Sequence, residues 1–216
     1  GMILDKLESK NLHSRITDLE KEKIKKGKSL ISAESRKKKL NQKGVTLWFT
    51  GLHGSGKNEL AFSLEKKLFD TDAVAVLLDG SSVRSGLNRE LDYSPADRAE
   101  NLRRVGHIAK ILNDQGIIAI CSFISPGNFL RNQIADIIGK ERFHLFYMNA
   151  SLDYCRKNKP ELYEKADKGE VDNLPGADIE YEEPDNASLV FSPTENELNL
   201  DKIMDYLEKN KIFPLA

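Results

Sequence analysis

Short apolar runs alternate with longer amphipathic segments from residue 44 onward, and this alternation limits the possible folds more than any other feature of the chain. The apolar runs predict strands at VTLWFT (45–50), AVAVLLD (73–79), IIAICSF (117–123), FHLFYMN (143–149) and SLVF (188–191). The first four are almost continuously apolar, as strands are when both faces of a parallel sheet are covered. The segments between the runs predict helices at about 57–69, 95–115, 128–139, 151–157, 160–168 and 197–209. We therefore expect a three-layer α/β fold, with a mostly parallel sheet and helices on both faces.

The stretch GLHGSGKNEL (51–60) joins the first predicted strand to the first predicted helix. Its glycines let backbone N–H groups point inward at phosphate oxygens, Lys57 adds a positive charge, and the helix adds the positive end of its dipole. This setting favours a phosphate-binding P-loop over a plain turn, and it predicts a fold of the P-loop nucleoside triphosphate hydrolase type. The candidate nucleotide-binding residues are Gly51, His53, Gly54, Ser55, Gly56, Lys57 and Asn58.

Two residues are candidate ligands of Mg²⁺. Asn58 stands where the P-loop pattern has a hydroxyl, and an amide must turn its carbonyl oxygen toward the ion, so the substitution should weaken the metal site without abolishing it. Asp79 ends the second predicted strand, at the sheet edge where ligands bind in such folds. Its carboxylate could hold Mg²⁺ or accept a proton from an acceptor hydroxyl. The alternative for Asp79 is a helix cap or a turn.

Residues 1–43 carry 13 Lys and Arg against 6 Asp and Glu, so this part of the chain is basic. We expect a helical N-terminal arm here, followed by one α/β domain at 44–216. The arm has no interleaved aromatic residues, and its charge therefore indicates a solvated helical face rather than a nucleic-acid partner. No apolar run approaches the roughly 20 residues of a membrane span, so we expect no membrane partner and a cytoplasmic location.

The stretch 156–186, here named the lid segment, combines dense mixed charge with Gly169, Pro175, Gly176 and Pro184. Such composition predicts an exposed excursion from the domain. In an enzyme that transfers phosphoryl groups, an excursion of this kind commonly closes over the site as a lid. An ordinary surface loop is the alternative.

Four motifs together resemble the adenylylsulfate kinase family: GVTLWFTGLHGSGKNELA, LLDGSSVRSGLNREL, YSPADRAENLRRVGHIAKIL and FISPG. Their order and spacing match over about residues 36–210, which is far more specific than the P-loop alone. Members of this family use ATP to phosphorylate the 3′-hydroxyl of adenosine 5′-phosphosulfate. The resemblance implies ATP and Mg²⁺ as cofactors, adenosine 5′-phosphosulfate as the substrate, and a homodimer.

The resemblance also implies a role for individual residues. Asp79, Lys57 and Ser125 are the candidate catalytic residues, with Asp79 as the base that activates the acceptor hydroxyl. Arg98 and Asn101 lie three residues apart on a predicted helix, so they share a face and could hold one ligand from one side. The full set of candidate substrate-binding residues is Arg84, Tyr93, Arg98, Asn101, Ile124 and Ser125.

The chain departs from the family pattern at Asn58, Ser81, Gly127 and Leu174. Ser81 removes a carboxylate near the expected metal site, and Leu174 removes an aromatic face on which the substrate adenine would stack. Stacking of a base on an aromatic ring contributes about 1–3 kcal/mol, so the loss is appreciable. Two alternatives therefore stay beside the adenylylsulfate kinase hypothesis: a nucleotide-binding protein without the reaction, and a kinase for a different small acceptor.

Overall fold

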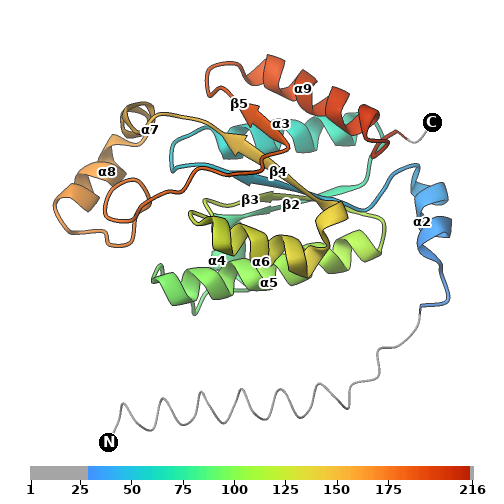
Figure 1. Ribbon diagram of the computed structural model, residues 1–216, viewed down its shortest axis with the longest axis horizontal. Helices are drawn as coiled ribbons and strands as arrows, with labels where there is room; N and C mark the ends of the chain where they lie inside the picture. The colour runs from blue at the N-terminus through green and yellow to red at the C-terminus, as the bar shows by residue number, and fades with distance from the viewer. Residues whose placement is uncertain (1–28, 215–216) are drawn as a thin grey trace, which may run out of the picture. The chain divides into compact units, whose positions relative to one another are not determined.

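The computed structural model describes residues 29–214, and the compact unit within them begins at Ala33. Its centre is a parallel sheet with the strand order β2-β3-β1-β4-β5 (Figure 1). The strands are β1 (Thr46–Thr50), β2 (Ala75–Asp79), β3 (Ile118–Ser122), β4 (Phe143–Met148) and β5 (Leu189–Phe191). The helices are α2 (Ala33–Leu40), α3 (Lys57–Asp70), α4 (Gly80–Ser85), α5 (Pro95–Asp114), α6 (Asn128–Ile138), α7 (Leu152–Asn158), α8 (Pro160–Asp167) and α9 (Asn196–Lys209), with a 3₁₀ turn at Lys140–Arg142.

Helices cover both faces of the sheet, which confirms the predicted three layers. Figure 1 shows α3 and α9 on one face and α5 and α6 on the other. Alternate residues of β1 divide between the two cores: Leu47 and Phe49 pack with α3 and α9, whereas Trp48 packs with α5 and α6. This division follows from the period of two along a strand, and it explains why the central strands are apolar at nearly every position.

The predicted strands and helices are all present, and their ends differ from the predictions by no more than about two residues, the usual uncertainty of such boundaries. The start of α5 is confirmed in detail, because the Ser94 side chain accepts a hydrogen bond from the amide of Asp97 and Pro95 is the first helical residue. Helix α4 was not predicted from the sequence. This six-residue helix has little apolar periodicity, and it depends on the side chain of Asp79, which caps its N-terminus.

Most of the predicted basic arm, residues 1–28, lies outside the described residues. Within the remainder of the arm, α2 is helical. Gln42, just after α2, binds this part of the chain to the domain through its side chain. The Gln42 side chain donates to the carbonyl oxygens of Val74 and Gly116, each at 2.8 Å, and it accepts from the amide of Val74. The boundary at residue 43 and the closing of the lid segment stay predictions.

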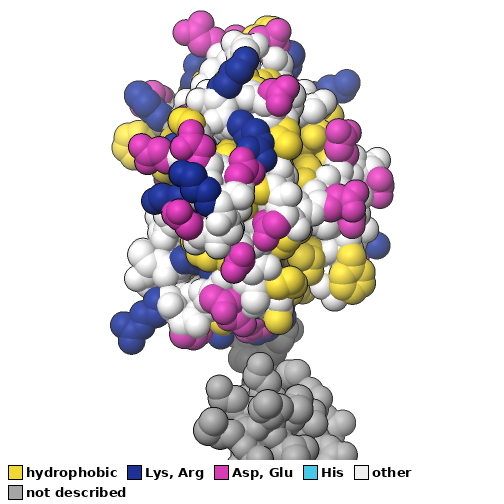
Figure 2. Space-filling view, turned by 90° about the vertical axis from the view of Figure 1, so that its left-hand side faces the viewer, with side chains coloured by type: hydrophobic (Ala, Val, Ile, Leu, Met, Phe, Trp, Pro, Cys, Tyr) yellow, Lys and Arg dark blue, Asp and Glu magenta, His cyan; other side chains and the backbone are white. Residues whose placement is uncertain are grey.

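Figure 2 views the molecule from the end at which α7 and α8 lie in Figure 1. Acidic and basic side chains are interspersed on this face, so it presents no broad surface of a single charge. Across residues 29–214, no helix combines the length and the apolar character that crossing a bilayer requires.

Burial on α3 allows a matched test of the core. Leu64 is fully buried against the sheet, whereas Phe62 on the same helix is 49% exposed. We expect Leu64→Ala to lower the free energy of unfolding by about 2–5 kcal/mol, because it removes buried methyl groups and leaves a cavity. Phe62→Ala should cost less than about 1 kcal/mol. Urea denaturation measures both, and equal losses would contradict the assignment of the core face.

Candidate active site

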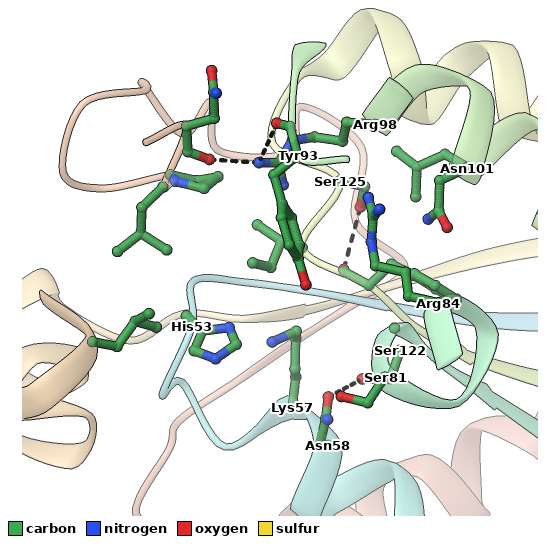
Figure 3. A pocket seen from close by; sticks show the side chains of 18 of the residues that line it. His53, Lys57, Asn58, Ser81, Arg84, Tyr93, Arg98, Asn101, Ser122 and Ser125 are labelled. Carbon is green, nitrogen blue, oxygen red and sulfur yellow. Dashed lines mark hydrogen bonds between the residues drawn. The ribbon is translucent and has the colours of Figure 1, made fainter. Parts of the chain in front are cut away.

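A cavity of about 370 Å³ opens at the carboxyl edge of the sheet, where parallel α/β folds bind their ligands (Figure 3). Its walls come from the P-loop and the start of α3, from α4, from the start of α5, from the loop after β3 and from the lid segment. The structure brings these candidate residues together around it: His53, Lys57, Asn58, Arg84, Tyr93, Arg98, Asn101, Ile124 and Ser125. Gly51, Gly54, Ser55, Gly56 and Asp79 lie nearby without lining the cavity.

Two glycines of the P-loop have positive φ angles but differ in their surroundings: Gly54 is closely packed, whereas Gly56 has open space beside it. Gly54 has a φ of +84°, and a Cβ there would lie 2.8 Å from the carbonyl oxygen of Cys155 in α7, so no side chain fits. Gly56 has a φ of +90° with no atom within 4 Å of such a Cβ. It precedes α3 without capping it by a side chain, which leaves the first amides of the helix available to an anion.

Lys57 is almost entirely buried, and its ammonium group has the carbonyl oxygen of Leu52 at 3.4 Å. Burial, more than neighbouring charges, lowers the pKa of Lys57 to about 8. His53 is its neighbour at the cavity wall (Figure 3). Burial, followed by the charge of Lys57, lowers the pKa of His53 to about 4, so this imidazole is neutral at pH 7. The P-loop side of the site therefore holds a poorly solvated positive charge that an anionic ligand would stabilise.

Side chains from α7 and α8 hold the P-loop in place. The Asn158 side chain donates to the carbonyl oxygen of Gly54, and the Tyr163 hydroxyl donates to that of His53, both at 3.0 Å. Leu174 is buried in a small apolar cluster with Tyr163. The lid segment thus packs against the back of the phosphate-binding loop as well as lining the cavity.

The two predicted Mg²⁺ ligands already accept hydrogen bonds from the protein. The hydroxyl of Ser122 donates to the Asn58 side-chain oxygen at 2.7 Å. Asp79 accepts from the amides of Ser81 and Ser82 and from the Ser82 hydroxyl. Within residues 29–214, no group of three or more His, Cys, Asp or Glu is arranged to hold a metal ion. These donor sets do not fit a preformed Mg²⁺ site built on Asn58 and Asp79.

Asp79 caps the N-terminus of α4, which is the alternative role that the sequence allowed for this residue. Burial acts to raise the pKa of Asp79, but the hydrogen bonds from Ser82 and Ser81 outweigh it, and the pKa lies below its usual range. The carboxylate therefore stays ionised at neutral pH and is a weak base. Its role in proton transfer stays a prediction.

The predicted acceptor-binding residues meet on the far wall of the cavity. The guanidinium of Arg84 lies 4.4 Å from the ring centre of Tyr93 and donates to the carbonyl oxygens of Leu91 and Asp92, each at 2.9 Å. This contact orients both side chains, since a cation is attracted to the face of an aromatic ring. Asn101 is 2% exposed, and its side-chain oxygen accepts from Asn88 at 2.9 Å.

Arg98 connects this wall to the lid segment. Its guanidinium donates to the carbonyl oxygens of Tyr93 and Asn173, and its Nε is buried without a hydrogen-bond partner. Burial, followed by the charge of Arg84, lowers the pKa of Arg98, which nevertheless stays charged at neutral pH. Asp92 and Asp178 interact with these arginines only at longer range, and neither arginine forms a salt bridge within residues 29–214, so the pair makes a wall suited to anions.

Ser125 lies in a strained turn, with a φ of +39°. Its hydroxyl accepts from Trp48 Nε1 and donates to Thr50 Oγ1, both at 3.1 Å, while Thr50 donates to the carbonyl oxygen of Ile124 at 2.6 Å. A hydroxyl has a single proton to donate, so these contacts commit Ser125 to holding the turn. The structure places this residue beside the cavity as part of its frame, and its catalytic role stays a prediction.

Arg131 and Tyr181 were missed from the sequence, although they hold the same turn. The fully buried Arg131 donates to the carbonyl oxygens of Ser125 and Glu182, and its guanidinium lies 5.6 Å from the ring centre of Tyr181. The Tyr181 hydroxyl is 2.9 Å from Thr50 Oγ1. The helical spacing of Arg131 with Ile134 and Ile138 was the available signal, since it places the arginine on the buried face of α6.

The buried charge of Lys57 has a consequence for stability without ligand. Folded Lys57 loses its proton near pH 8, whereas the unfolded lysine keeps it to about pH 10.5, so the unfolded chain binds more protons between these values. Stability therefore rises with pH across this window. We expect Lys57→Met to raise the free energy of unfolding of the ligand-free protein by about 1–3 kcal/mol at pH 7, with a smaller gain at pH 9.5.

Lys66→Met is the matched control for this measurement, because the Lys66 side chain on the same helix is 76% exposed and pairs only with Asp70. It should change stability by less than about 0.5 kcal/mol at either pH. Urea denaturation of the three proteins at both pH values checks the prediction. A less stable Lys57→Met protein at pH 7 would show that the ammonium group is well accommodated.

Known proteins match the chain over most of this domain. A sequence model of the adenylylsulphate kinase family matches residues 43–192. The adenylyl-sulfate kinase of Clostridium acetobutylicum is 42% identical over 186 residues, covering 84% of this chain and 92% of that protein. The adenylyl-sulfate kinase of Staphylococcus carnosus is 38% identical over 187 residues, covering 85% and 94%.

Solved structures agree with these sequence matches. The structure of the Mycobacterium tuberculosis APS kinase in complex with AMPPNP and APS superposes with a TM-score of 0.74 at 37% identity, over 77% of this chain and 99% of that one. A hexameric APS kinase from Thiobacillus denitrificans gives a TM-score of 0.61 at 27% identity, over 80% of this chain and 30% of that one. The shared fold, the P-loop and the extent of the sequence matches show that this chain belongs to the adenylylsulphate kinase family.

Proposed function

We propose that this protein transfers the γ-phosphate of ATP to the 3′-hydroxyl of adenosine 5′-phosphosulfate. The observation that carries the proposal is a single cavity that joins the P-loop lysine, Lys57, to the wall formed by Arg84, Arg98 and Asn101. Family membership supports it, and so does the related M. tuberculosis kinase, whose structure contains AMPPNP and APS.

The P-loop side of the cavity suits the donor. The open N-terminus of α3 and the Lys57 ammonium would face the β- and γ-phosphates, where negative charge is concentrated. Phosphoryl transfer depends mainly on positioning and on neutralising charge, and a fixed cation in a water-poor site supplies both. Binding would also relieve the cost of burying the lysine.

The opposite wall suits the acceptor. Arg84 and Arg98 would bind its phosphosulfate oxygens, since the planar guanidinium donates two parallel hydrogen bonds to such groups. The adenine would stack on Tyr93, a residue that is 59% exposed. Leu174 supplies an apolar contact in place of the second ring, so adenine binding should depend more strongly on Tyr93 than on the lid segment.

Three further features stay proposals that the family supports. Mg²⁺ would enter with ATP, because the predicted protein ligands do not form a ready site. A homodimer follows from the resemblance alone, and light scattering on the purified protein tests it. A cytoplasmic location is consistent with a reaction that uses ATP.

Release of ADP tests the proposed function directly. A coupled assay should show ADP formation that requires adenosine 5′-phosphosulfate, and Arg98→Ala should raise KM for this acceptor about tenfold or more by removing a charged hydrogen bond. Arg103→Ala is the matched control, because Arg103 lies on the same helix, 50% exposed and paired with Glu100. Folded protein that forms no ADP in response to the acceptor would disprove the proposal.

Asp79→Asn separates the two roles of Asp79. The amide oxygen can still accept from the amides of Ser81 and Ser82, so we expect unfolding free energy to change by less than about 1 kcal/mol. If the carboxylate accepts the acceptor proton, kcat should fall by about 10²–10⁴. We expect a stable variant whose ADP release is almost abolished. Near-normal turnover would show that Asp79 serves only as the helix cap.

A further inference from the structure

The side chain of Asn58 is held in one orientation at the floor of the cavity. Asn58 is the second residue of α3, and its oxygen accepts the hydrogen bond from Ser122 at 2.7 Å. Ser122 is the last residue of β3 and is only 2% exposed, so it is a fixed support. Figure 3 shows this bond, with Ser81 close by.

This bond decides what Asn58 offers a ligand. An amide has an acceptor oxygen on one side and two N–H donors on the other. The bond from Ser122 takes one of the two lone pairs of the oxygen and fixes the plane of the amide, so the two N–H donors are the larger part of its bonding capacity left for a ligand. A donor group is unsuited to a metal cation and suited to a phosphate oxygen, and it lies here on the first turn of a helix whose N-terminus attracts anions.

The surroundings of Asn58 agree with an anion rather than a cation. The P-loop pattern would place a hydroxyl here, and the family pattern would place a carboxylate at position 81, where this chain has a serine. Asp79 directs its oxygens at Ser81 and Ser82. Among the described residues, the one carboxylate that lines the cavity is Asp172, on the lid segment. The ammonium of Lys57 lies on the same floor.

We propose that Asn58 binds the terminal phosphates of the nucleotide as a hydrogen-bond donor, with Ser122 as its positioning residue, and does not ligate Mg²⁺. This rests on the proposed function as an ATP-dependent kinase. It also means that the metal ion is held by the nucleotide alone, so that the protein binds ATP nearly as well without Mg²⁺ as with it. The residue pair replaces a metal contact by a direct phosphate contact.

Nucleotide binding without an acceptor tests the proposal. Isothermal titration of ATP, once with excess Mg²⁺ and once with EDTA, should give dissociation constants within about threefold of each other for the unaltered protein. Asn58→Ser restores the hydroxyl that ligates Mg²⁺ in the P-loop pattern, and we expect Mg²⁺ then to tighten ATP binding about tenfold.

Two nearly isosteric variants separate a donor from a metal ligand. Asn58→Asp exchanges the donor for a carboxylate, so ATP binding in EDTA should weaken about tenfold or more, with partial recovery in Mg²⁺. Ser122→Ala frees the amide, and binding in EDTA should weaken about threefold while a dependence on Mg²⁺ emerges. Ser63→Ala, on the same helix with an exposed hydroxyl bonded to the backbone of Glu59, should leave both values unchanged.

The opposite pattern would overturn the proposal. If Mg²⁺ tightens ATP binding tenfold in the unaltered protein and Asn58→Asp keeps or strengthens that effect, Asn58 is a metal ligand. Such a result would leave acceptor-dependent ADP release intact, so it differs from a failure of the proposed function. Absence of ATP binding under both conditions would overturn this proposal together with the kinase assignment.

Discussion

The turn from β1 into α3 is the constraint on which the rest of the site depends. Its backbone is held from outside, since Gly54 lies against the carbonyl of Cys155, and Asn158 and Tyr163 donate to the carbonyl oxygens behind it. With its carbonyls occupied on the outer side, the loop can turn amides and Lys57 toward the cavity. This arrangement leaves the ammonium group poorly solvated. An anionic ligand therefore stabilises this group more than the little water around it does.

The sequence was sufficient for the fold because its local signals agree with one another. Apolar runs on both faces of the central strands, a proline and a capping serine at the start of α5, and a glycine-rich loop between strand and helix all predict the same layered sheet. Family motifs named Arg84, Arg98 and Asn101 as one set of candidate substrate-binding residues, and in the structure all three line one cavity. The short helix α4 and the 3₁₀ turn at Lys140–Arg142 were not predicted, because elements of three to six residues leave almost no periodic pattern.

The chemistry of the site was harder to predict, since it depends on partners that meet only across strands. Asn58 is hydrogen bonded to Ser122, and Ser125 to Trp48. The sequence around Asn58 and Ser125 does not identify these partners. Arg131 was overlooked for a different reason. A lone arginine on a helix is usually solvated, and its burial follows only when its carbonyl partners from two other segments are known.

The lid segment is anchored at several points, and this limits where its length can change. Asn158 donates to the carbonyl oxygen of Gly54 near one end, and Arg131 donates to that of Glu182 near the other. Between them, Arg98 donates to the carbonyl oxygen of Asn173, and Leu174 is buried beside Tyr163. Gly169 and Glu170 are exposed, and a Cβ at Gly169 would meet no other atom within 4 Å. Extra residues are therefore accommodated best at this turn, where the chain can lengthen without disturbing the contacts that shape the cavity wall.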